Sequence, residues 1–243
     1  MPDSTDVLSD PTGFPMVWCE PLRVFVHWLP VTKIQFEHFL CAAPDAYFDA
    51  AWYETALGLN PRVSPRAVSM GNYWQALMTA VTPAEAQRFA SWCGDGYRLP
   101  TAGEWTTAYR ALRVRPAVDL AGSPLLANRE PRTQELLTRL DVAGRQAAAR
   151  MNDSPALATQ MLLRYGAMEW VRSDNALSGW SAKGEPLPDF CANLERLEDV
   201  ATPLAADATS QRLPAAGFRL VWSPPSIRSD DGRTPRSGDT AGG

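Results

Sequence analysis

The chain has 243 residues, 45% hydrophobic and 21% charged, an ordinary globular composition that is long enough to bury a core in one large domain or two small ones. Its formal net charge of −4 excludes the basic excess of a generic nucleic-acid binder. No apolar run in the sequence approaches the roughly 20 residues that span a bilayer, and the acidic N-terminus lacks the basic and apolar stretches of a secretory signal. We therefore expect a cytoplasmic protein that does not enter a membrane.

Both ends of the chain have compositions typical of disorder. Residues 1–13 contain few apolar side chains, and residues 223–243 consist mainly of Pro, Gly, Ser, Thr and charged residues, with Ile227 as the one branched aliphatic residue. Such segments bury too little surface to offset the entropy of ordering. We expect both to be disordered, with the folded domain between them.

The first predicted element is a strand over residues 23–28, where β-forming residues are concentrated. Three helix starts follow, and each has a capping box, in which a Thr hydroxyl accepts from the third helical amide and a Gln or Glu side chain reaches back to the cap amide. These capping boxes are Thr32–Gln35, Thr82–Glu85 and Thr101–Glu104. We expect a helix to begin at each of them.

A helical insertion is predicted over about 133–163. Residues 133–151 place Leu136, Leu137 and Leu140 on one stripe of an amphipathic helix, and Ser154-Pro155 starts a shorter helix that ends near residue 163. Such a helix either packs on the core or docks a partner, and its apolar stripe favours packing.

The last part of the chain is predicted to be irregular between two strands. Residues 168–171 and 218–222 are rich in β-formers, whereas residues 173–216 lack periodicity and indicate mostly loop. A compact domain with so much irregular chain commonly uses it to form a site.

Several segments, in the same order along the chain, resemble the formylglycine-generating-enzyme (sulfatase-modifying-factor) family. The most specific is YRLPTAGEW at Tyr97–Trp105, which nearly repeats the family's YRLPTEAEW. Weaker matches are PVTKIQFEHF at Pro30–Phe39, the helix ending in SWCG at Ser91–Gly94, GAMEWV at Gly166–Val171 and GFRLV at Gly217–Val221.

The resemblance covers roughly residues 14–222 and implies an α+β domain related to C-type lectins, with short strands, several helices and much irregular loop. The motif residues also have a structural interpretation, which we prefer: caps, core side chains and ion pairs between Arg and Glu. They identify a fold and say little about chemistry. The residues are Arg98, Thr101, Glu104, Trp105, Glu169, Trp170, Gly217, Phe218 and Arg219.

The same resemblance implies a chemistry that this sequence lacks. Family enzymes bind copper(I) through two cysteines shortly before the GFR motif, whereas Cys191 is the single cysteine between Trp170 and Gly217. We therefore predict no catalytic residue and no metal or cofactor. His27 and His38 lie on separate elements and are too few for the histidine cluster of the iron-dependent relatives or for a zinc site. Calcium ligands leave no short motif, so the sequence does not decide that case.

The resulting hypothesis is a non-catalytic binding or scaffold module in a bacterial multi-protein system, with another protein as partner and an undetermined oligomeric state. The predicted contacts lie in the irregular segment, where an exposed aromatic among polar residues is typical of an interface. They are Asn175, Trp180, Asp189, Phe190 and Asn193.

Two alternatives stay open. One is a divergent copper oxidase that joins Cys191 to Cys93 or another thiol and acts on a substrate cysteine. The other is a variable lectin-like ligand-display protein, although residues 190–216 are rich in Ala and Leu rather than in Asn.

Overall fold

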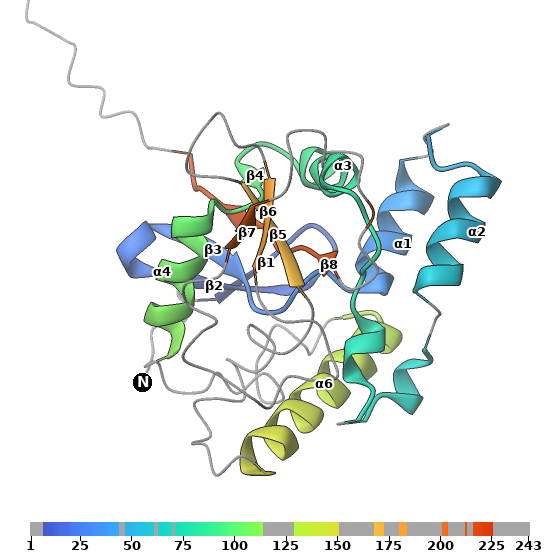
Figure 1. Cartoon of the computed structure of the whole chain (residues 1–243). Helices are drawn as coiled ribbons and strands as arrows, with labels where there is room; N and C mark the ends of the chain where they lie inside the picture. The colour runs from blue at the N-terminus through green and yellow to red at the C-terminus, as the bar shows by residue number, and fades with distance from the viewer. Residues whose placement is uncertain are drawn as a thin grey trace, which may run out of the picture.

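The computed structural model describes residues 7–43, 47–60, 63–69, 71–113, 129–150, 168–172, 180–183, 201–203, 212 and 216–225. Over these ranges helices surround two small sheets, in agreement with the expected α+β class (Figure 1).

The first sheet has five strands in the order β1-β2-β3-β9-β4, and its neighbouring strands are antiparallel. The predicted strand at 23–28 is β3, which lies at the centre of this sheet. The strands are β1 (Val7–Ser9), β2 (Pro15–Cys19), β3 (Val24–His27), β9 (Val221–Trp222) and β4 (Tyr97–Arg98).

The second sheet has the order β7-β6-β5-β8, with β5 and β8 parallel. Two of its strands, β6 and β7, lie inside residues 173–216, so the expectation of loop there is wrong at these places. β6 pairs with β5 and β7 pairs with β6, and no local pattern in the sequence reveals these pairings. The strands are β7 (Ala201–Pro203), β6 (Trp180–Lys183), β5 (Met168–Arg172) and β8 (Ala216–Gly217).

The predicted strand at 218–222 forms only at its end, as β9, and residues 218–220 connect it to β8 of the other sheet. Gly217 pairs with Glu169 in the second sheet, whereas Val221 pairs with Val26 and Arg98 in the first. This crossing of the chain ties the two sheets together.

All three capping boxes are present. Thr32 and Thr82 exchange both hydrogen bonds with Gln35 and Glu85, and Thr101 does the same with Glu104. Sequence analysis missed α2, whose N-cap is Asp49. The helices are α1 (Lys33–Ala42), α2 (Ala50–Leu59), α3 (Pro83–Cys93), α4 (Ala102–Arg113) and α6 (Pro131–Arg150), with short 3-10 turns η1 (Glu20–Leu22), η2 (Pro65–Ala67) and η3 (Tyr73–Ala76).

The expectation of disorder over residues 1–13 is wrong for residues 7–13. Strand β1 pairs with β2, and the next turn is organised by the buried carboxylate of Asp10, which accepts from the amides of Thr12 and Phe14 at 2.9 and 2.8 Å. Gln35 of α1 donates to the same carboxylate at 2.9 Å. A single buried polar side chain therefore orders a segment whose composition is typical of disorder.

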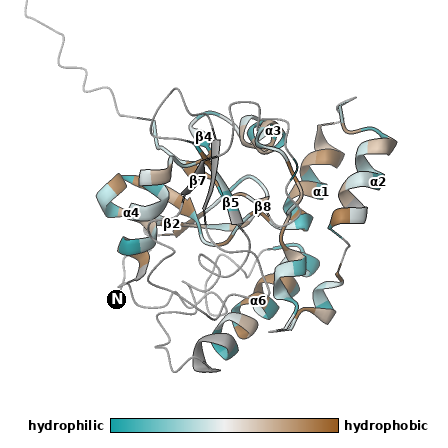
Figure 2. Ribbon diagram, in the orientation of Figure 1, coloured by the Kyte–Doolittle hydropathy of each residue, from teal (hydrophilic) through white to brown (hydrophobic). Residues whose placement is uncertain are grey.

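The predicted helix at 133–151 is α6, and it packs on the core. Its Leu136, Leu137 and Leu140 are buried, whereas Val142 on the opposite side is 45% exposed. The amides of Arg132 and Thr133 donate to the Glu130 carboxylate, which explains why the helix starts at Pro131, earlier than predicted. Figure 2 shows the corresponding mixture of polar and apolar residues along α4 and α6. The shorter helix predicted up to residue 163 lies outside the described residues.

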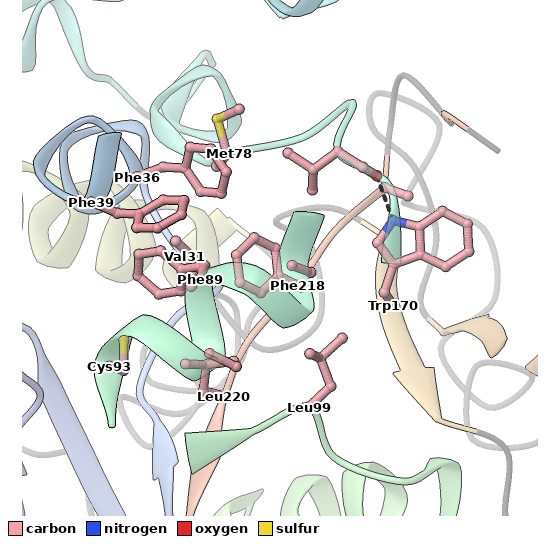
Figure 3. Close-up of a cluster of buried hydrophobic side chains, with 14 of the residues drawn as sticks. Val31, Phe36, Phe39, Met78, Phe89, Cys93, Leu99, Trp170, Phe218 and Leu220 are labelled. Carbon is pink, nitrogen blue, oxygen red and sulfur yellow. Dashed lines mark hydrogen bonds between the residues drawn. The ribbon is translucent and has the colours of Figure 1, made fainter. Parts of the chain in front are cut away.

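The core between α1, α3 and the second sheet is largely aromatic. The Phe89 ring lies 5.7 Å from that of Phe36 and 5.5 Å from that of Phe218. Trp170 is fully buried, and its indole N–H donates to the Val81 carbonyl at 2.7 Å (Figure 3). Trp170 and Phe218 are both fully buried in this core.

Candidate functional site

The Glu169–Arg219 pair is the most buried charged group of the motif residues. Arg219 donates to both Glu169 oxygens at 2.6 and 2.7 Å, and both side chains are 1% exposed. The Trp105 indole donates to the same carboxylate at 2.9 Å, and Arg219 also donates to the His27 carbonyl at 2.9 Å. The pair thus connects β5, α4, β3 and the segment before β9.

The Arg98–Glu104 pair is half-buried and also structural. Its two N–H···O bonds are each 2.6 Å long, and Glu104 also accepts from the Thr101 amide. Burial raises the pKa of Glu104, but the hydrogen bonds from Arg98 and Thr101 outweigh it and hold that pKa below its ordinary value. The pair locks β4 to the start of α4.

Gly217 allows the backbone of β8 to approach another segment closely. A Cβ at this position would lie 2.6 Å from the Met78 carbonyl oxygen, closer than real Cβ contacts allow. The close approach of the two backbones therefore explains why the GFR motif has glycine at this position, without any catalytic role.

Glu85 was predicted only as part of a capping box, but in the structure it also organises a polar cluster. Its buried carboxylate accepts from Trp52 at 2.7 Å and from Tyr47 at 3.2 Å. Arg212 donates to both of its oxygens, at 2.5 and 2.9 Å, and to the Ala80 carbonyl. The cluster ties α2, α3 and Arg212 together, and the full burial of Glu85 is a signal that only tertiary structure gives.

The described cysteines do not form a thiolate site. Cys93 is buried in the aromatic core, and burial raises its thiol pKa well above the ordinary range, with a smaller contribution from the charge of Asp10. Cys19 is buried as well, and Cys41 is exposed. Cys191, the cysteine of the copper alternative, lies outside the described residues.

His27 and His38 occupy different environments. His27 is buried, with its Nε2 3.2 Å from an Asp10 oxygen. His38 is exposed on α1 and lies edge-on to Trp92. Within the described ranges no three His, Cys, Asp or Glu side chains gather as metal ligands.

The predicted binding residues are placed only in part. Trp180 is the first residue of β6, where it pairs with Arg172, so it belongs to a strand instead of the expected loop. Asn175, Asp189, Phe190 and Asn193 lie outside the described residues.

A groove between α1 and α2, which lie side by side in Figure 1, is the candidate binding site. It is open to solvent and leaves about 30 Å³ of free room, well below the volume of pockets that enclose a small molecule. Its lining is mainly apolar and aromatic, with a few polar groups at the edges. The lining residues are Lys33, Phe36, Glu37, Leu40, Trp52, Tyr53, Ala56, Asn60 and Met78.

Polar groups around this groove already have partners. The Asn60 amide donates to the Leu77 and Thr79 carbonyls, and the Trp52 indole donates to Glu85. Glu37 lies 4.0 Å from Arg132 of α6. The remaining surface is suited to part of an apolar side chain, because little hydrogen-bonding capacity is left to satisfy. The groove was not predicted because α2 was not predicted. The sequence does contain a signal for α2, since Asp49 is an N-cap residue that precedes a run of good helix formers.

Neither a protein-family model nor a curated protein or solved structure matches the chain. Within the described ranges, every helix falls short of the length and apolar character needed to cross a bilayer.

Proposed function

We propose that the chain is a non-catalytic binding module with the formylglycine-generating-enzyme-like, C-type-lectin-like fold, and that it holds an apolar side chain of another protein in the α1–α2 groove. The proposal assigns no cofactor, and it places the module in the cytoplasm as part of a bacterial multi-protein system. The order of the motifs supports the family, and the groove supports the binding role.

The first support for a non-catalytic role is that the motif side chains already bind one another inside the fold. The carboxylates of Glu104, Glu169 and Glu85 are each occupied by an arginine and by a second donor. Groups that are satisfied in this way hold segments together and do not turn over a substrate. The buried, protonated thiol of Cys93 points the same way, since copper(I) needs thiolate ligands.

The apolar groove is the observation on which the binding role depends. Phe36 and Leu40 of α1, Tyr53 and Ala56 of α2 and Met78 make up its apolar lining. Interfaces place their strongest contacts where an anchor side chain fills such a pocket and excludes water. An apolar anchor from a partner protein fits this lining better than a charged substrate does.

A photo-crosslinking residue at Tyr53 tests the binding role in the cells that encode the chain. We expect one dominant crosslinked partner, which disappears when Ala56→Trp fills the groove. The control carries the same residue at Glu54, one position along α2 and exposed, and it should crosslink weakly. Equal crosslinking from both positions, or crosslinking that survives Ala56→Trp in a folded protein, would contradict the groove assignment.

The enzyme alternative is tested separately with copper(I). Titration of the purified chain, followed by oxygen consumption with a cysteine-containing peptide, should give no stoichiometric tight binding and no turnover. Tight binding with turnover would overturn the non-catalytic assignment whatever the groove binds.

A further inference from the structure

Four aromatic side chains form a row across the first sheet, and one of them, Tyr97, opens the YRLPTAGEW motif. Register places Trp18 of β2 opposite Phe25 of β3, and Trp222 of β9 opposite both Phe25 and Tyr97 of β4. Adjacent ring centroids are 5.0, 5.8 and 6.0 Å apart. We call Trp18, Phe25, Trp222 and Tyr97 the aromatic row.

The row lies on the face of the sheet opposite its small apolar core. Strand alternation sends Cys19, Val24, Val26 and Val221 to the inner face, where they pack against Ala108 of α4. All four row residues are instead partly exposed. The rings are tilted to one another by 34° to 58°, so no ring covers its neighbour face to face.

Local structure fixes the two tryptophans of the row. The Trp222 indole donates to the Asp95 carbonyl at 3.2 Å, and the Trp18 indole donates to the Glu20 carboxylate. Gly96 has a φ of +86°, and a Cβ there would lie 2.6 Å from the Ser223 carbonyl and 3.1 Å from the Trp222 ring nitrogen. The turn before β4 is therefore shaped around Trp222, and both indole donors are already engaged.

Charge decides which ligand suits this surface. An aromatic face is electronegative, and two exposed acidic residues adjoin the row: the Glu20 carboxylate accepts from the Trp18 indole, and the backbone carbonyl of Asp95 accepts from the Trp222 indole. Stacking platforms for single-stranded nucleic acid need a basic groove, which the neighbouring carboxylates oppose. Arg23, two residues before Phe25, is exposed and positively charged, so it opposes a cationic ligand at that ring.

We propose that the aromatic row binds arginine or lysine side chains from a basic segment of a partner protein. A guanidinium interacts favourably with a ring when it lies within about 6 Å of the centroid. Because adjacent centroids are 5.0 to 6.0 Å apart, one guanidinium above the row is within reach of two rings at once. Glu20 and Asp95 then accept its remaining N–H groups.

This inference uses residues different from those of the α1–α2 groove. Its failure leaves the proposed function standing, and failure of the groove crosslinking leaves the row to be judged on its own result.

The test is fluorescence anisotropy of the full chain with a labelled peptide of alternating arginine and glycine at low salt. A matched peptide with citrulline in place of arginine keeps the shape and removes the charge. We expect the arginine peptide to bind at least tenfold more tightly than the citrulline peptide. Phe25→Leu and Trp222→Leu should each weaken binding by about tenfold, whereas Trp92→Leu, the loss of a partly exposed aromatic outside both the row and the groove, should have no effect.

Substitutions at two exposed residues keep the proposal testable if the row variants fail to fold. Glu20→Gln retains an acceptor for the Trp18 indole, and Asp95→Asn leaves the backbone carbonyl that Trp222 uses. Each substitution should weaken binding of the arginine peptide by threefold or more, and Arg23→Gln should strengthen that binding. Equal binding of the two peptides, unchanged binding in Glu20→Gln and Asp95→Asn, or row-dependent preference for chitohexaose or oligo(dT) would overturn the assignment.

Discussion

At the residue scale, single side chains in this protein hold distant segments together through complete hydrogen bonding. Asp10 is the clearest case: the amides of Thr12 and Phe14, the side chain of Gln35 and the nearby His27 all surround one buried carboxylate. Leaving such a buried group without its partners costs far more than an exposed hydrogen bond contributes. Residues 7–13 are ordered for this reason although their composition predicts disorder.

Asp10 should make the stability of the protein depend on acid pH. Burial raises its pKa, but hydrogen bonds and charge from His27, together with Thr12 and the Phe14 amide, outweigh burial and leave the pKa below its ordinary value. A lowered carboxyl pKa contributes stability that is present above the unfolded value of about 4 and is lost as pH falls through the folded value. Urea unfolding from neutral pH down to about pH 3 should show this loss. Asp10→Asn should show a smaller loss over the same window.

The matched control for that experiment is Glu54→Gln, at an exposed carboxyl on α2. It should retain the pH dependence of the parent protein. An Asp10→Asn variant as acid-sensitive as the parent would contradict the role assigned to Asp10.

Alanine substitutions at Gly217 and at Gly58 should change the free energy of unfolding in opposite directions. At Gly217 a Cβ would lie 2.6 Å from the Met78 carbonyl, whereas nothing lies within 4 Å of a Cβ at Gly58 inside α2. We expect Gly217→Ala to lower the free energy of unfolding by about 2 kcal/mol or more, as overpacking does. Gly58→Ala should raise it by about 0.5–1 kcal/mol because alanine favours helix. Chemical denaturation measures both, and a neutral Gly217→Ala would show that β8 and Met78 move apart at little cost.

At the element scale, helix α6 shows how an insertion becomes part of the core. Its starting residues Glu130 and Pro131 supply a cap and a fixed first φ, and its leucine stripe joins the same cluster as Trp105 and Tyr109 of α4. The capped helices were predictable because a capping box is local in sequence. Helix α2 was missed, although Asp49 caps it, because its apolar residues show little separation into faces.

Substitutions on two sides of α6 should separate packing from helix propensity. Leu137 is fully buried and Val142 is 45% exposed. We expect Leu137→Ala to lower the free energy of unfolding by about 2–5 kcal/mol and Val142→Ala to change it by less than about 0.5 kcal/mol. Thermal or urea unfolding gives both values. A small effect at Leu137 would indicate that α6 detaches from the core without unfolding it.

At the scale of the whole molecule, a chain crossing and a buried ion pair help to join the two sheets. Residues 216–222 pair with β5 and then with β3 and β4, and Arg219, between those pairings, binds Glu169 and the His27 carbonyl. A buried pair contributes little net free energy when intact, but loss of one partner leaves an uncompensated charge.

Removal of Arg219 should therefore cost more than removal of the whole pair. We expect Arg219→Met to lower the free energy of unfolding by about 3–5 kcal/mol, because Glu169 stays buried and unpaired. The double variant Arg219→Met with Glu169→Gln should recover part of this loss, since Gln still accepts from the Trp105 indole. Urea unfolding of both proteins measures the coupling, and a double variant less stable than the single one would contradict the expected sign.

The sequence by itself determined the three capped helices, the leucine stripe of α6, the central strand β3 and the pairing of Arg with Glu in the motifs, because each depends on neighbours a few residues apart or on a motif read directly. Tertiary structure alone decided that β1 is ordered, that Trp180 lies in a strand, that α1 and α2 enclose a groove and that four aromatic rings align across the first sheet. The physical reason is that pairing between distant strands and burial of polar groups depend on contacts between residues far apart in the chain, for which local composition contains no signal.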